Sequence, residues 1–157
     1  MKKNRGFTLI ETLVVIGIFL VLAGISSMSL GNLYPQANLS VSTNVLMSDI
    51  KTQQLKSMTG YSFSSTQIES HGVYFEPTQY TLFTGSSFSP ADTRNIVISP
   101  GVNISLSTVN ITGNTLIFSA GSGEVAGYVV GGVVTVTETN TSQQKSLEIN
   151  PMGSISL

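Results

Sequence analysis

One long apolar run with a single charge inside it dominates the first 30 residues of this chain. From residue 7 to residue 30 the only charged side chain is that of Glu11. As an α-helix, these 24 residues would be about 36 Å long, more than the roughly 30 Å of a bilayer's hydrocarbon core. We therefore expect a transmembrane helix over residues 7–30.

The basic residues before the run predict its orientation. Lys2, Lys3 and Arg5 precede it, and the next Lys or Arg is Lys51. Because cytoplasmic flanks of membrane helices are rich in Lys and Arg, we expect the amino terminus in the cytoplasm and the rest of the chain outside. A secretory signal cleaved near residues 26–31 is the alternative, but the apolar core of such signals is shorter, about 7 to 15 residues.

Glu11 is the anomalous residue of the run. It lies about one helical turn inside the expected span, where a lone carboxylate costs about 2 to 3 kcal/mol. Either its side chain reaches back to the headgroup region, or it meets a positive partner in an assembled state. A free amino terminus on a neighbouring copy would be such a partner, if cleavage created one at the right depth.

The segment Lys2–Glu11 reads Lys-Lys-Asn-Arg-Gly-Phe-Thr-Leu-Ile-Glu and closely resembles the class III leader of type IV prepilins and type II secretion pseudopilins. The resemblance implies that a prepilin peptidase cuts between Gly6 and Phe7 and then N-methylates Phe7. It also implies that Glu11, the fifth residue of the mature chain, pairs with the terminal amine of an adjacent subunit during assembly. The resemblance directly covers about the first 30 residues, and the expected helix extends it to about residue 60.

Two departures separate this chain from many major pilins of Gram-negative bacteria. Those pilins carry a helix-kinking proline where this chain has Met28, and its first proline is Pro35, which we expect to kink or interrupt the helix. They also close a C-terminal loop with a disulfide, and this chain has no cysteine. The resemblance therefore favours a minor pilin or pseudopilin.

A second helical pattern covers residues 37–58. Its apolar positions recur with the helical period near one face and comprise Leu39, Leu46, Ile50 and Met58. Its polar positions are expected mostly away from that face and comprise Ser42, Asp49, Gln53 and Lys56. We expect the apolar face to pack on the domain that follows, and Gly60 to end the helix.

From residue 61 the hydrophobic period changes from 3.6 to 2, which indicates strands. Eight or nine short strands are predicted, at 73–75, 80–83, 96–98, 102–106, 116–118, 128–130, 133–136, 147–149 and 155–157. We therefore expect an α+β fold, with a long N-terminal transmembrane helix before an antiparallel, β-rich globular domain of sandwich or roll-like form. The expected divisions are a leader (1–6), a transmembrane helix (7–30), its extramembrane continuation (31–60) and the β-rich domain (61–157).

One long helix followed only by strands resembles the minor pseudopilins with H-type globular domains. Three strings support this closer resemblance: Gly72–Phe75, Phe118–Gly121 and Leu147–Ile155. The sequence shows no calcium loop of the kind that major secretion pseudopilins carry near the C-terminus.

The sequence contains no constellation typical of a catalytic or metal site. His71 is the only histidine, and with Glu69 and Glu76 it would make a poor zinc site, so we expect a surface or turn residue. With no cysteine there is no thiolate, and the serines near His71 belong to a Ser-rich stretch, without support for a triad. We therefore expect a structural protein, not an enzyme, with no cofactor and no metal.

The charge distribution argues against nucleic-acid binding. Removal of residues 1–6 deletes three of the seven basic residues and changes the side-chain charge from −1 to −4. The remaining cations are spread along the chain, whereas phosphate binding needs a cluster. The expected partners are other pilin or pseudopilin subunits, the prepilin peptidase, an inner-membrane assembly platform and, before assembly, membrane lipid. A DNA-uptake pilin and a non-polymerising, membrane-anchored surface or adhesive domain remain the alternatives.

Overall fold

A computed structural model describes residues 8–30, 33–60 and 68–157; the side chains of residues 26–30 and 33–34 are outside this description. The chain divides into two compact units, Met1–Gln36 and Ala37–Leu157. The functional divisions expected at residues 6, 30 and 60 stay predictions, because unit boundaries set by contacts do not test them.

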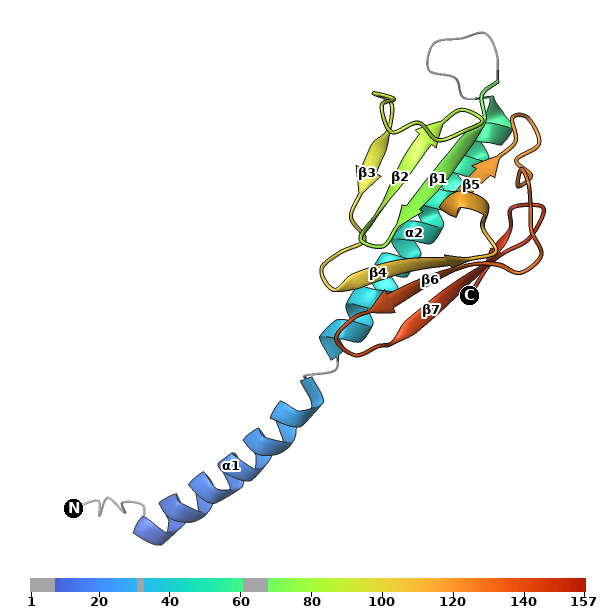
Figure 1. The fold of residues 1–157 in the computed structure, drawn as a ribbon. Helices are drawn as coiled ribbons and strands as arrows, with labels where there is room; N and C mark the ends of the chain where they lie inside the picture. Colours follow the sequence, from blue (N-terminus) through green and yellow to red (C-terminus); the bar gives the residue numbers. More distant parts are fainter. Residues whose placement is uncertain (1–7, 31–32, 61–67) are drawn as a thin grey trace. The chain divides into compact units, whose positions relative to one another are not determined.

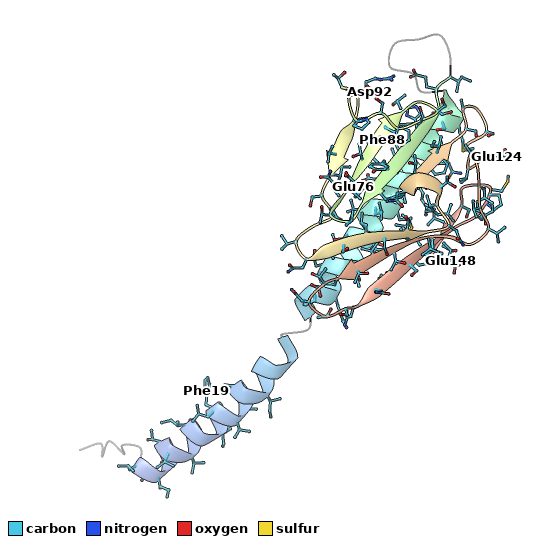
Figure 2. All side chains as sticks on the ribbon, in the orientation of Figure 1. Phe19, Glu76, Phe88, Asp92, Glu124 and Glu148 are labelled. Atoms are coloured by element: carbon cyan, nitrogen blue, oxygen red, sulfur yellow. The ribbon has the colours of Figure 1, made fainter. Side chains whose placement is uncertain are left out.

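Helix α1 (Leu9–Leu30) makes up most of the first unit. Its apolar side chains between Leu9 and Ile25 are exposed in the isolated chain, and Figure 2 shows one of them, Phe19, projecting from the helix. Within the described ranges, no helix combines the length and the apolar character that crossing a membrane requires. The expected transmembrane helix over residues 7–30 is therefore not confirmed.

Helix α2 (Leu33–Thr59) extends further towards the N-terminus than its apolar pattern predicted. Pro35 lies in its first turn, where a helix does not need the missing N–H group. Helix α2 continues past Pro35, so this proline does not interrupt it, and residues 31 and 32 before α2 lie outside the described residues. Gly60 follows the last helical residue with φ +71°, a left-handed conformation that glycine adopts without strain, so the predicted helix stop is confirmed.

The buried face of α2 is not quite the one that the sequence predicted. Leu39, Leu46 and Ile50 are buried as expected, but the side chain of Met58 is 50 % exposed. Gln53, expected outside, is only 2 % exposed, and Ser42 is buried as well. Serine can be buried here because its hydroxyl donates a hydrogen bond to the carbonyl of Pro100 in the β-rich unit, which satisfies its polar group.

Two four-stranded antiparallel sheets follow α2 in the chain (Figure 1). The first sheet has the order β3 (Ile96–Ile98), β2 (Gln79–Thr84), β1 (His71–Glu76) and β5 (Thr115–Phe118). The second has the order β4 (Ile104–Val109), β6 (Gly132–Glu138), β7 (Gln144–Ile149) and β8 (Ile155–Ser156). A short 3-10 helix, η1 (Thr112–Asn114), precedes β5. The α+β class with antiparallel sheets is confirmed.

Both sheets share one hydrophobic core with α2, which runs behind them in Figure 1. Alternate residues of each strand point into this core, as the period of two predicted. From the second sheet these are Ile104, Leu106, Val134, Val136, Leu147, Ile149 and Ile155; from the first sheet they include Val73, Phe75, Leu116 and Phe118. The intervening side chains of the second sheet face outwards.

One strand prediction was wrong, and another placed the start of its strand two residues too early. Residues 128–130 form no strand, because Gly127 (φ +64°) and Gly131 (φ +76°) turn the backbone on either side of them. Val102 was expected to begin a strand, but it is 77 % exposed and precedes Asn103, whose φ of +62° interrupts extended backbone. Strand β4 therefore begins at Ile104.

Candidate functional site

Of the three residues predicted to carry processing and assembly, the structure describes only Glu11. Gly6 and Phe7, which flank the expected cleavage point, lie outside the described residues. The described chain begins at Thr8, which immediately precedes α1. The geometry of the site is therefore that of Thr8 and the first helical turn.

Thr8 and Glu11 cap the start of α1 reciprocally. The Glu11 N–H lies 3.4 Å from the Thr8 Oγ1 atom, and the Thr8 N–H donates back to Glu11 Oε2 at 3.4 Å. The Thr8 hydroxyl also donates to Glu11 Oε2, at 3.3 Å. This arrangement is a capping box, in which two side chains satisfy backbone donors that the first helical turn leaves free. All three bonds are longer than the usual 2.9–3.0 Å, so each is expected to contribute modestly.

The Glu11 carboxylate lies in the positive end of the dipole of α1. The N-terminus of an α-helix carries a partial positive charge of about half an elementary charge, and Glu11 lies in the first turn of α1. Both donated bonds end on Oε2, and the side chain is exposed. The site therefore presents an accessible negative charge at the start of an otherwise uncharged helix.

Thr8 is the functional residue that the sequence analysis missed. Its signal was present, because Thr8-Leu9-Ile10-Glu11 has the Thr-x-x-Glu spacing of a capping box just before an apolar run. The expected membrane setting of Glu11 pointed to a distant cation, whereas the nearest donors to its carboxylate belong to Thr8 in the same turn.

The prediction for His71 was wrong, because this residue is neither on the surface nor in a turn. His71 begins β1 and is only 2 % exposed. Its backbone N–H donates to Ser57 Oγ of α2 at 3.0 Å, and its Nδ1 atom lies 3.3 Å from Thr84 Oγ1. The histidine is thus part of the packing between α2 and the first sheet.

The carboxylates near His71 in the sequence have other partners. Glu69 and Asp92 both form ion pairs with Arg94, at 3.3 and 2.8 Å, and Gln79 donates to Glu76 at 2.6 Å. Hydrogen bonds from Arg94 hold the pKa of Asp92 below its ordinary value. Throughout the part of the chain that the structure describes, no three His, Cys, Asp or Glu side chains are grouped as a metal site would require.

The fold and the site together define a class of protein. Its chain begins with an apolar helix whose only charged residue, Glu11, caps the first turn, and an antiparallel β-rich unit follows. Residues 1–27 match the family model described as the prokaryotic N-terminal methylation motif. The chain therefore carries the class III leader of a type IV prepilin- or pseudopilin-family protein. No curated protein and no solved structure matches it.

Proposed function

We propose that the chain is a structural, non-enzymatic subunit of a type IV pilus or type II secretion-like filament, and that it is a minor pilin or pseudopilin. The observation that carries the proposal is the methylation motif at residues 1–27, with Glu11 as the one charge between residues 7 and 30. Met28 in place of a kinking proline and the absence of cysteine support the minor role.

In this proposal the precursor is inserted with its amino terminus in the cytoplasm and residues 7–30 across the inner membrane. The three basic residues before the run support that orientation. Prepilin peptidase then cuts between Gly6 and Phe7 and methylates the new amine of Phe7. The assembly platform finally draws the chain out of the lipid, which leaves the β-rich unit in a periplasmic or cell-surface filament.

The proposed chemistry of assembly is an ion pair between Glu11 of one subunit and the Phe7 amine of its neighbour. A lone carboxylate inside a membrane span costs about 2 to 3 kcal/mol, and a cation at the same depth offsets that cost. The exposed position of Glu11 in the first turn of α1 supports this role, because its carboxylate remains accessible to a second chain.

Two measurements test the proposal in cells that assemble the filament. Mass spectrometry of the mature chain should find an N-methylated Phe7 at the amino terminus. Glu11→Ala should leave cleavage intact and reduce incorporation into filaments, while the control Glu124→Ala, an exposed acid of the β-rich unit, should leave both unchanged.

The following outcomes would contradict the proposed function. An intact Met1, or a terminus near residues 27–32, would exclude pilin-type processing and favour a membrane-anchored surface domain or a secreted protein. Normal incorporation of Glu11→Ala would refute the ion pair. Tight, salt-dependent binding of the purified chain to DNA would instead favour the DNA-uptake alternative.

A further inference from the structure

The outer face of α2 carries an unpaired cation among exposed aliphatic side chains. Lys51 lies beside a shallow hollow of about 330 Å³ that Met47 and Leu55 also line, and Val41 is exposed about three turns before it on the same face. Within the described residues, no hydrogen bond or ion pair involves the Lys51 ammonium. Asp49, the only acid of α2, accepts a hydrogen bond from Tyr80 and so does not neutralise this face.

The second sheet has a pocket of opposite charge. It has a volume of about 270 Å³ and is lined by Glu148 of β7, Tyr128 of the loop before β6, and the polar residues Asn150 and Ser156. In the described part of the chain, the Glu148 carboxylate has no protein partner. Val130, in the same loop as Tyr128, is 81 % exposed, so an apolar group adjoins the carboxylate here as well.

Glu148 is conspicuous because its surroundings are neutral. The other outward-facing positions of β4, β6 and β7 are uncharged. These positions lie directly opposite one another on neighbouring strands, as Ser107, Thr135 and Ser146 do. In low-charge surroundings an added cation meets one attractive site and little competition. The pocket therefore fits a single positively charged side chain.

Lys51 and Glu148 lie on opposite sides of one core. Ile50, which precedes Lys51, is buried in the same cluster as Leu147 and Ile149, which flank Glu148 on β7. Since successive side chains of a strand point to opposite faces, Glu148 faces away from that cluster and from α2. The two charges cannot meet within one chain, but they can meet between two copies.

We propose that Lys51 of one copy enters the Glu148 pocket of the next, with Leu55 and Val130 packing beside the ion pair. Complementary patches on opposite sides of a subunit form a head-to-tail contact, which generates an open filament unless the rotation closes a ring. The Tyr128 ring adds a face suited to a cation. This inference rests on the proposed function, because the filament brings the copies together, and it requires that some copies be neighbours.

The absence of cysteine makes a direct test possible. Full-length Lys51→Cys/Glu148→Cys protein, assembled in cells and treated with a thiol-specific cross-linker of about 10 Å, should give cross-linked dimers, because an extended Lys51 side chain holds the two Cα atoms beyond the roughly 7 Å that a direct disulfide spans. Each single variant alone should give no dimers. The matched control is Lys51→Cys/Glu124→Cys, because Glu124 is also an exposed acid but lies outside the pocket; Figure 2 shows both acids.

A complementary test exchanges the charges. Lys51→Glu and Glu148→Lys should each reduce incorporation into filaments by about tenfold, and the double exchange should restore it, since it re-forms the pair. The proposal is overturned if the double-cysteine protein gives no cross-linked dimers, if Lys51→Cys alone forms dimers, or if the Glu124 control cross-links equally well. Normal cleavage before Phe7 together with any of these results would refute this contact and leave the proposed function standing.

Discussion

Thr8 and Glu11 hold each other at the start of α1, with the threonine hydroxyl 3.3 Å from the glutamate Oε2 atom. Both residues lie after the expected cleavage point, so a cut between Gly6 and Phe7 would remove neither of them. The cap provides the carboxylate with two hydrogen-bond donors of its own helical turn while no partner subunit is present. Glu11 therefore has a local role in the helix and a proposed role in assembly, and the two can be separated.

Glu11→Gln separates charge from capping. Glutamine at this position of a capping box still accepts the Thr8 N–H bond, but it carries no charge to pair with an amine. We expect Glu11→Gln to reduce filament incorporation as strongly as Glu11→Ala. Quantitative immunoblotting of sheared filaments measures this, and a glutamine variant that assembles like the native chain would show that Glu11 acts only as a cap.

Thr8→Val tests the cap without removing the charge. Valine has nearly the shape of threonine but cannot accept the Glu11 N–H bond, and loss of an N-terminal cap typically costs about 1 kcal/mol. We expect faster hydrogen exchange at the first-turn amides of the full chain in detergent micelles. Thr8→Ser keeps the hydroxyl and should exchange like the native chain; equal protection in the valine variant would contradict the cap.

The Tyr80 hydroxyl connects β2 to α2 through a 2.6 Å hydrogen bond to Asp49 Oδ2. Burial of the ring and this bond raise the pKa of Tyr80 well above its ordinary value. In a spectrophotometric titration of the folded chain, one of the five tyrosines should stay protonated when exposed tyrosines have ionised. Tyr80→Phe should abolish that late step and lower the free energy of unfolding by about 2 kcal/mol, the usual worth of a hydrogen bond to a charged group. If the late ionisation step remains in Tyr80→Phe, the assignment of that step to Tyr80 is wrong.

Glu138 makes the stability of the β-rich unit sensitive to acid. Its Oε2 atom accepts hydrogen bonds from the hydroxyl and the N–H of Thr141, both at 2.7 Å, and these lower the pKa of the carboxyl from its ordinary 4.5. The stabilisation is present above the ordinary pKa and is lost as the pH falls through the lowered value. Glu138→Gln should therefore lower the melting temperature at neutral pH and flatten its fall in acid. An unchanged pH profile would show that other groups set it.

Gly72 is required by close packing at the centre of the first sheet. A Cβ atom there would lie 2.7 Å from the Leu116 carbonyl oxygen and too close to the Phe83 ring. Gly72→Ala should lower the free energy of unfolding by about 2–3 kcal/mol, since backbone cannot move aside cheaply. In the control Gly127→Ala the added Cβ meets nothing within 4 Å, so only the cost of its positive φ applies, about 1–2 kcal/mol. Equal losses in both variants would exclude the clash.

Much of the secondary structure could be predicted because it depends on local patterns. Alternating apolar residues located most of the strands, and Gly60 located the end of α2. The predictions failed where contacts distant in sequence decide the outcome. Gln53 and His71 looked like surface residues, yet each is only 2 % exposed. The apolar string at 128–130 looked like a strand, but glycines on both sides and its place between β5 and β6 make it a loop.

The sequence by itself determined the leader, the apolar run and the lone charge of Glu11, because these features are contiguous and need no partner from elsewhere in the chain. The capping of Glu11 by Thr8 is also local, and the Thr-x-x-Glu spacing alone predicts it. Only the tertiary structure decided which strands are neighbours, and that Lys51 and Glu148 face opposite ways across one core. Those relationships arise when segments about a hundred residues apart pack together, and no local pattern encodes which face each will present.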